Sequence, residues 1–299
     1  MDLREILEKV RVPPGSKVKL SRFDPAWPGT AEMKHLCGDK LKMRAKRMIE
    51  QNVHELANAQ ELLWASDTYA MLVVFQAMDA AGKDGTIKHV MSGVNPQGCE
   101  VVSFKAPTAE ELDHTFLWRV AKASPSRGKI TIFNRSHYED VLIVKVHPEL
   151  LEQSKLPPGK RGKSFWRARY DDINSFEQHL HRNGTRIVKF FLNLSKDEQK
   201  RRFLSRLDDK RKHWKFSMAD VRERGYWDKY QSAYQDMLRA TSTRWAPWYV
   251  IPADNKWVAR AMVSAILTHE INTLELRWPE VNDEHRKELA EARKRLLSE

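Results

Sequence analysis

The residues best suited to chemistry lie in the stretch Phe75–Lys88, which reads FQAMDAAGKDGTIK. An apolar, valine-rich run precedes its turn, and a segment of helical character begins at Thr86. A strand, a tight turn and a helix form the setting in which backbone N–H groups bind phosphate and a lysine adds a full charge. Lys83 follows Gly82 here, as in the phosphate-loop pattern Gly-x4-Gly-Lys-Ser/Thr. We therefore expect Lys83 to hold a transferred phosphoryl group.

The turn departs from that pattern. Ala77 stands at the first glycine, Asp84 replaces the magnesium-binding hydroxyl, and Thr86 comes two positions late. Asp79 is an additional carboxylate, and it is the first candidate for a magnesium ligand, with Asp84 the second. Capping the loop is the alternative role for Asp79, and stabilising the helix dipole is the alternative for Asp84. A Gly-Lys turn before an ordinary helix is the alternative interpretation of the whole stretch.

A second polar segment, Asn134 to Asp140, follows another apolar run. The guanidinium fork of Arg135 suits phosphate oxygens. Asn134 stands where a magnesium-binding Asp is usual, and a neutral amide binds a hard cation less well. Neither a Ser–His–Asp set nor a metal-spaced Cys/His cluster is evident in the sequence. None is required if the acceptor is a nucleotide phosphate, whose second pKa of about 6 leaves it ionised at neutral pH.

The formal net charge of +12 is concentrated in two segments. Residues 155–170 carry six Lys/Arg and no Asp/Glu, and residues 186–215 carry eleven Lys/Arg against four Asp/Glu. This local basicity favours a polyanionic ligand, although two solvated charged faces are the alternative. We expect the second segment to close over the site as a lid that also excludes water. Its predicted phosphate-binding cations are Arg202, Arg206, Lys210, Arg211 and Lys215.

Hydrophobic periodicity predicts strands and helices in alternation along the chain, and therefore parallel strands with helices on both faces. The fold class is α/β, with five strands expected near residues 70–76, 100–104, 129–134, 186–193 and 248–251. Helices are expected at residues 39–65, 86 onward, 108–123, 171–182, 195 onward, 217–241 and 256–274. The loops after the first, third and fourth strands should meet at one edge of the sheet.

We expect three regions: an extended N-terminal arm (1–38), a phosphate-loop kinase domain (39–276) with its lid at about 195–217, and a helical tail (277–299). The hydrophobic fraction of 41% and the charged fraction of 31% are typical of a soluble globular protein. The sequence shows no apolar run near the ~20 residues that span a bilayer and no signal-peptide hydrophobic region. Two cysteines make no disulfide framework, so a cytoplasmic protein without a membrane partner is expected.

Three motifs in order resemble those of the polyphosphate kinase 2 family: 75–88, the stretch IFNRSHYEDV at 132–141, and LDDKRKHWKF at 207–216. The similarity covers nearly the whole chain from about Pro13 to Leu274. It implies a fold similar to thymidylate kinase and reversible phosphoryl transfer between inorganic polyphosphate and nucleotides, with Mg²⁺ or Mn²⁺. The sequence Asn-Arg-Ser-His-Tyr-Glu in the second motif resembles class III members, which phosphorylate both AMP and ADP. GMP and GDP are further candidate acceptors.

The resemblance also implies roles for individual residues. Asp79, Lys83 and Arg135 match the catalytic and phosphate-binding positions, and Glu139 takes the class-distinguishing position near the acceptor nucleotide, beside Asn134. The predicted phosphate and polyphosphate contacts in the loop and its helix are Gly82, Asp84, Gly85, Thr86 and Lys88, in addition to the five lid cations. Candidates for stacking on the acceptor base are Phe104, Trp118 and Trp214, each with core or lid packing as its alternative role.

Two alternative functions would each explain part of this sequence. An ATP-dependent nucleoside monophosphate kinase would have a similar loop and lid, but it would not require so many cations. A single-stranded nucleic-acid-binding protein would explain the basic and aromatic residues of 163–170 and 211–216, although nothing in that role requires Asp79 and Lys83. The expected ligands are therefore polyphosphate and adenine nucleotides rather than nucleic acid, and the expected assembly is a homo-oligomer, a dimer or a tetramer.

Overall fold

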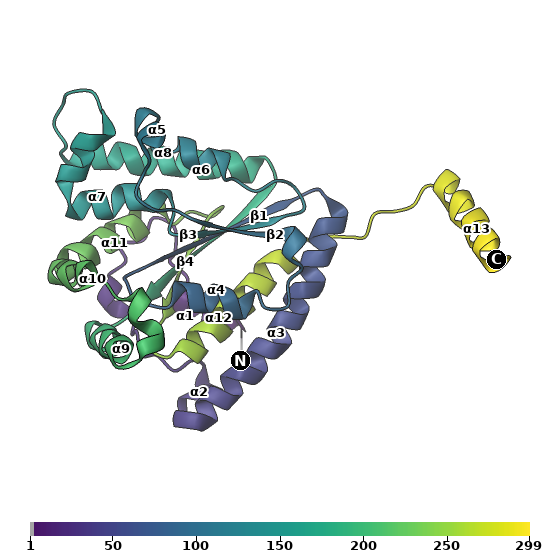
Figure 1. The fold of residues 1–299 in the computed structure, drawn as a ribbon, viewed down its shortest axis with the longest axis horizontal. Coiled ribbons are helices and arrows are strands. Elements are labelled where there is room, and N and C mark those ends of the chain that lie inside the picture. The colour runs from purple at the N-terminus through teal and green to yellow at the C-terminus, as the bar shows by residue number, and fades with distance from the viewer. Residues whose placement is uncertain (1–2) are drawn as a thin grey trace.

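The computed structural model describes residues 3–299, which are organised around one five-stranded parallel sheet (Figure 1). The strand order is β2-β3-β1-β4-β5, so β1 lies at the centre between β3 and β4. The predicted α/β fold with a five-stranded parallel sheet is confirmed. The strands are β1 (Ala70–Ala77), β2 (Cys99–Ser103), β3 (Ile130–Asn134), β4 (Thr185–Asn193) and β5 (Trp248–Pro252).

Helices cover both faces of the sheet, and each face has its own hydrophobic core (Figure 1). Successive side chains of β1 point to opposite faces. Met71, Val73 and Phe75 pack with α1, α3, α4 and α12, whereas Leu72 and Val74 pack with α6, α7, α8 and α11. The helices are α1 (Leu3–Val10), α2 (Ala31–Lys34), α3 (Gly38–Ser66), α4 (Lys83–Val90), α5 (Ala109–Asp113), α6 (Trp118–Lys122), α7 (Ile143–Val146), α8 (Lys163–Arg182), α9 (Lys196–Asp208), α10 (Met218–Glu223), α11 (Trp227–Thr241), α12 (Lys256–Asn272) and α13 (Asp283–Leu297).

The N-terminal region is not simply an extended arm, and that prediction is corrected. Residues 3–10 form α1, whose Ile6 and Val10 side chains are buried in the core. The backbone then runs beside the edge strand β5, where Val12 N donates to Trp248 O at 2.9 Å. The spacing of Leu3, Ile6 and Val10 is typical of a helix, but it extends over only eight residues. The proline-rich residues that follow favour an extended chain, and the prediction for the whole region rests on them.

Three predicted helices have different bounds in the structure. The helix expected at 108–123 is divided into α5 and α6. The helix expected at 217–241 is divided into α10 and α11 by a short 3-10 turn that contains Gly225, because glycine weakens a helix interior. The helix α8 begins at Lys163, well before the expected start, so it includes part of the basic segment 155–170.

The C-terminal helix α13 buries no residue and lies apart from the rest of the molecule at the end of an extended segment (Figure 1). Across residues 3–299, no helix combines the length and the apolar character needed to cross a membrane.

Candidate active site

The phosphate-type loop connects β1 to α4, as the sequence predicted. Lys83 is the first residue of α4, and its Nζ donates to the backbone oxygen of Ala77 at 3.0 Å. Gly82 caps the helix in a left-handed conformation with φ of 102°. Ala77, at the first glycine position of the pattern, has no positive φ, whereas Ala80 has φ of 63°. The loop therefore contains two left-handed residues, Ala80 and Gly82, and of these the alanine adopts the conformation with strain.

Asp79 and Arg135 meet across neighbouring strand ends. Arg135 Nη2 lies 2.9 Å from Asp79 Oδ1. Arg135 has φ of 63°, and its backbone N donates to Phe75 O at 3.1 Å, which fixes the turn that leaves β3 against β1. Such strain at a site is maintained only where the surroundings over-determine the conformation. The structure thus brings Asp79, Lys83 and Arg135 together at the carboxyl edge of the sheet.

Glu139 shares the electrostatic environment of this cluster. Burial raises the pKa of Glu139, although the charges of Arg135 and Lys83 oppose the increase. Burial and the charge of Arg135 lower the pKa of Lys83. The Gln76 amide fits best with its nitrogen donating to Glu139 Oε1 at 2.9 Å and its oxygen accepting from Ser136 N at 3.2 Å. Gln76, on β1, therefore orients Glu139 beside the cationic groups.

The other loop residues are placed around this cluster. Asn134 Nδ2 donates to Asp84 Oδ1 at 2.9 Å, which ties the end of β3 to the first turn of α4. Thr86 is buried, whereas Lys88 is exposed. Gly85 lies against α12, because a Cβ added there would be 3.0 Å from Arg260 Nη2.

The lid helix α9 is attached directly to the loop through Arg202. Arg202 Nη1 donates to Ala80 O at 3.0 Å and to Ala81 O at 2.8 Å. Its Nη2 donates to Ala253 O at 2.5 Å and to Asp254 O at 3.0 Å, and its Nε donates to Glu198 Oε1 at 2.7 Å. Arg202 is buried and uses all three nitrogens within the protein. Arg202 therefore holds the loop, the lid and the loop after β5 together, and in this structure none of its nitrogens is left for the phosphate contact that the sequence predicts.

Arg206, one turn later on α9, pairs with a carboxyl group of the next helix. Its Nη1 lies 3.6 Å from Asp220 Oδ2, at the start of α10. Burial, then the charge of Asp79, raises the pKa of Asp220, which shows that this lid carboxyl group shares the field of the cluster. Sequence reasoning placed Asp220 only in the first turn of a helix and assigned it no role in the site. Lys210, Arg211 and Lys215 are exposed on the 3-10 segment that follows α9, with Arg211 paired to Asp209 at 3.1 Å.

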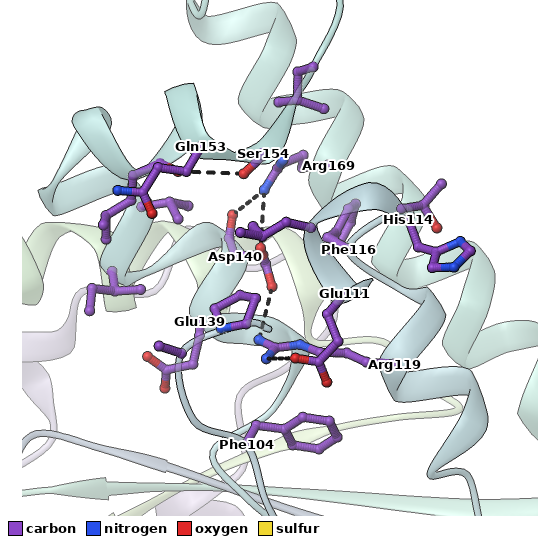
Figure 2. A pocket seen from close by; sticks show the side chains of 18 of the residues that line it. Phe104, Glu111, His114, Phe116, Arg119, Glu139, Asp140, Gln153, Ser154 and Arg169 are labelled. Atoms are coloured by element: carbon purple, nitrogen blue, oxygen red, sulfur yellow. Dashed lines mark hydrogen bonds and ion pairs between the residues drawn. The ribbon is translucent and has the colours of Figure 1, made fainter. Parts of the chain in front are cut away.

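A cavity of about 540 Å³ opens beside Arg135 and Glu139 (Figure 2). Its volume is within the range of about 300–1,000 Å³ that is usual for small-molecule sites. Phe104, a candidate for base stacking, lines it. Trp118 instead stacks on His114 with ring centroids 4.0 Å apart, and Trp214 is 78% exposed on the lid. The wall of the cavity also includes Phe116, Arg119, Asp140, Phe165 and Arg169.

Two arginines flank Asp140 in the cavity wall (Figure 2). Arg119 Nη2 lies 3.8 Å from Asp140 Oδ2, and Arg169 Nη1 lies 3.7 Å from Asp140 Oδ1. Burial raises the pKa of Asp140 to about 6, against the opposing charges of Arg169 and Arg119. Sequence reasoning missed these arginines, because residues from segments far apart in the chain form the wall only after folding.

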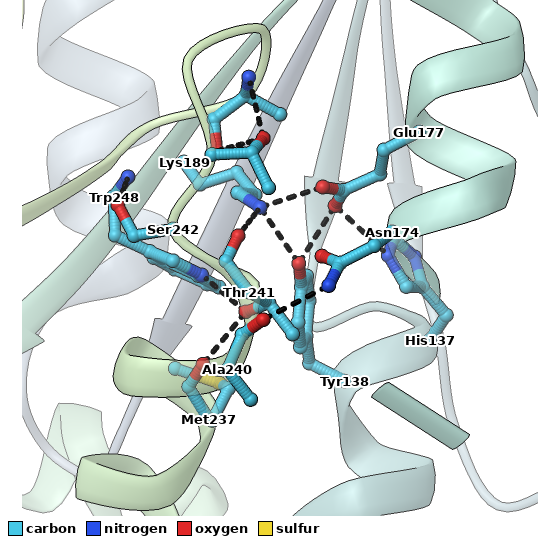
Figure 3. A network of polar contacts seen from close by, with 12 residues as sticks. His137, Tyr138, Asn174, Glu177, Lys189, Met237, Ala240, Thr241, Ser242 and Trp248 are labelled. Atoms are coloured by element: carbon cyan, nitrogen blue, oxygen red, sulfur yellow. Dashed lines mark hydrogen bonds and ion pairs between the residues drawn. The ribbon is translucent and has the colours of Figure 1, made fainter. Parts of the chain in front are cut away.

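A buried polar network anchors the turn that carries Glu139 (Figure 3). Lys189 Nζ lies 2.6 Å from Glu177 Oε2, and Lys189 also donates to Tyr138 Oη at 2.8 Å. Tyr138 in turn donates to Glu177 Oε1 at 2.7 Å. Burial lowers the pKa of His137, whose Nε2 lies 3.3 Å from Glu177 Oε1. The network joins β4 and α8 to the 3-10 helix His137–Val141, and so fixes the position of Glu139.

Comparison with known proteins agrees with this geometry. The profile of the family described as Polyphosphate kinase 2 (PPK2) matches residues 40–278. An "ADP-polyphosphate phosphotransferase" from Rhodopseudomonas palustris is 50% identical over 97% of this chain and 98% of its own length. An "AMP/ADP-polyphosphate phosphotransferase" from Meiothermus ruber is 44% identical over 92% of this chain and 96% of its own. The crystal structure of polyphosphate kinase 2 from Arthrobacter aurescens TC1 superposes with a TM-score of 0.84 at 39% identity, covering 97% of this chain and 96% of that one.

Proposed function

This chain belongs to the polyphosphate kinase 2 family, and on that premise we propose that it transfers the terminal phosphoryl group of inorganic polyphosphate to AMP and to ADP. One observation carries the proposal. The phosphate-type loop with Lys83, and Arg135 with Glu139, meet at the mouth of a cavity of about 540 Å³. The donor phosphate fits the loop, and the acceptor nucleoside fits the cavity.

The acceptor would lie with its base toward the aromatic wall of the cavity and its phosphate toward Arg135. An oxygen of the acceptor phosphate attacks the terminal phosphorus of the polymer, and the bridging P–O bond breaks. The products are a nucleotide longer by one phosphate and a polymer shorter by one. Since the attacking oxygen is already ionised near neutral pH, no protein base is needed. Catalysis is then mainly positioning and charge neutralisation.

Lys83 and Arg135 supply the neutralising charge on the protein side. Both side chains are partly shielded from solvent, which makes their interaction with the transferring group stronger than it would be in water. Glu139, oriented by Gln76, would position the acceptor phosphate. One of the two relatives is named for ADP alone and the other for both AMP and ADP, so their names do not decide whether AMP is an acceptor. The assignment of AMP as an acceptor therefore depends on Glu139.

The residues present fit Mg²⁺ held between protein and substrate. Among residues 3–299, no group of three or more His, Cys, Asp or Glu side chains could hold a metal ion. Mg²⁺ is usually bound by one or two carboxylates together with substrate phosphates and waters. Asp79, whose Oδ1 accepts a hydrogen bond from Arg135 Nη2, is the carboxylate that would hold the ion. Asp84 Oδ1 instead accepts a hydrogen bond from Asn134 Nδ2. The ion would neutralise phosphate charge during transfer.

The deciding experiment is a donor and acceptor assay. Purified protein is incubated with Mg²⁺ and long-chain polyphosphate, with AMP, ADP, GMP or GDP as acceptor, and nucleotides are separated by chromatography. We expect ADP and ATP to form from AMP. In a parallel arm ATP replaces polyphosphate as donor. Formation of ADP from AMP only in the ATP arm would mean that the donor is wrong.

Two substitutions test the site itself. Lys83→Ala and Asp79→Ala should each reduce kcat/KM about 100-fold or more, because each removes a charge that acts on the transferring group. Far-ultraviolet circular dichroism should be unchanged, since neither side chain is in the hydrophobic core. Lys294→Ala on the separate helix α13 is the control. Turnover retained in either variant would remove that residue from the mechanism.

A further inference from the structure

Lys256 and Arg260 form a pair of cations beside the loop that the assigned site does not use. They lie one turn apart at the start of α12, on the side of α4. In the described part of the chain, neither has a hydrogen bond or an ion pair, and Arg260 Nε is buried without an acceptor. Burial lowers the pKa of both, and the charge of Arg202 lowers them further. The charge of Glu198 opposes this effect at Lys256, but the cations outnumber the carboxylates here, and the surplus of positive charge favours an anion.

The pair is continuous with the phosphate loop. Arg202 joins the loop to the start of α12 through its bonds to Ala80, Ala81 and Ala253. Gly85, in the first turn of α4, has no side chain to keep Arg260 away from that turn. A line of positive charge therefore leads from Lys83 past Arg202 to Lys256 and Arg260.

The indole of Trp257 holds part of this surface in place. Arg260 Cζ lies 4.7 Å from its ring centroid, and Lys46 Nζ, from α3, lies 5.0 Å from the same centroid. Cation–π contacts of this kind restrain the cations without neutralising them. A nucleobase stacking on Trp257 would have to displace one of them. The surface thus suits a chain of phosphates better than a donor nucleoside.

From this geometry we propose that Lys256 and Arg260, with Lys46 at the far end, form a distal subsite for the polyphosphate donor. The proposal rests on the function proposed above. When the terminal phosphate lies in the loop at Lys83, the following units of the polymer lie along the start of α12. The subsite makes the affinity of the enzyme depend on polymer length, because a short donor ends before it reaches these cations.

The test compares long-chain polyphosphate with tripolyphosphate as donor and as ligand. The variants are Lys256→Gln, Arg260→Gln and the double variant. The control, Arg293→Gln with Lys294→Gln, removes the same charge from α13. Measured quantities are KM and kcat with saturating AMP, and the dissociation constant of each phosphate by calorimetry at several salt concentrations.

For the double variant we expect KM and the dissociation constant for long-chain polyphosphate to rise about tenfold. The slope of log affinity against log salt should decrease in magnitude by about 1 to 2. Values for tripolyphosphate, the KM for AMP and the kcat should stay within about twofold, as should every value of the control. The exposed Lys256→Gln alone should show part of the effect, which separates it from any folding defect at Arg260.

Two results would overturn the subsite. One is unchanged affinity for the long polymer in the double variant, and the other is an equal loss for both donors, which would indicate general damage to the loop. Either result can be interpreted only if the wild-type enzyme consumes polyphosphate. A wild-type protein that neither binds nor consumes polyphosphate would instead refute the proposed function, so the two failures are distinct.

Discussion

Replacing Arg202 by alanine should destabilise the fold far more than replacing Arg206, although both are lid arginines on α9. Arg202 donates to four backbone oxygens and to Glu198, and it is 5% exposed. Each bond contributes about 0.5–1.5 kcal/mol net, and the carbonyl groups left without a donor add to the loss. We expect Arg202→Ala to lower the free energy of unfolding by about 3 kcal/mol or more.

The assay is urea unfolding followed by fluorescence, with thermal unfolding as a second measurement. A loss of about 3 kcal/mol corresponds to a decrease in Tm of roughly 6–12 °C for a domain of this size. Arg206→Ala, whose one described ion pair spans 3.6 Å, should lose less than about 1 kcal/mol. Its kcat/KM with polyphosphate should nevertheless fall about tenfold or more, because Arg206 adds positive charge beside Asp220, whose carboxyl group is in the field of Asp79, Arg135 and Lys83.

The opposite pattern would refute the reasoning. If Arg202→Ala kept the stability of the wild type to within about 1 kcal/mol and raised only the KM for polyphosphate, Arg202 would be a ligand for the donor rather than a structural clamp.

Three further predictions concern the loop and the acceptor cavity. Glu139→Asn should lower kcat/KM with AMP at least about tenfold more than with ADP, because Glu139 lies where the cavity meets Arg135; an unchanged ratio in the chromatographic assay would remove Glu139 as the basis for AMP use. Because the pKa of Asp140 is raised from 3.8 to about 6, the folded state binds its proton more tightly than the unfolded state. The wild type should therefore gain stability relative to Asp140→Asn, by up to about 2 kcal/mol, as pH falls from 7 to 4, and a difference independent of pH in urea unfolding would contradict this. Ala80→Gly should raise the free energy of unfolding by about 0.5–1 kcal/mol with kcat/KM within about twofold, since φ of 63° strains alanine but not glycine; a loss of stability in the same experiment would be inconsistent with that strain.

Local sequence was sufficient for the centre of the fold and for the first half of the site. The apolar run that ends at Phe75, the turn with Gly82 and the helix beginning at Lys83 are neighbours in the chain, so their pattern alone predicts β1, the loop and α4. Alternation of strands and helices then predicts that Arg135, at the end of β3, lies beside the loop, because parallel strands end at one edge. The five expected strands overlap the observed ones because each strand is a continuous, largely apolar segment of the chain.

Tertiary structure decided which charged side chains are available to substrates. Lid composition predicted a phosphate ligand at Arg202, yet backbone oxygens of Ala80, Ala81 and Ala253 use its donors. Backbone acceptors are present at every residue, so sequence cannot show which of them will face an arginine. The walls of the cavity were not predicted for a similar reason, since they come from segments remote in the chain. The position of Arg260 beside Gly85 likewise exists only once α12 is packed against α4.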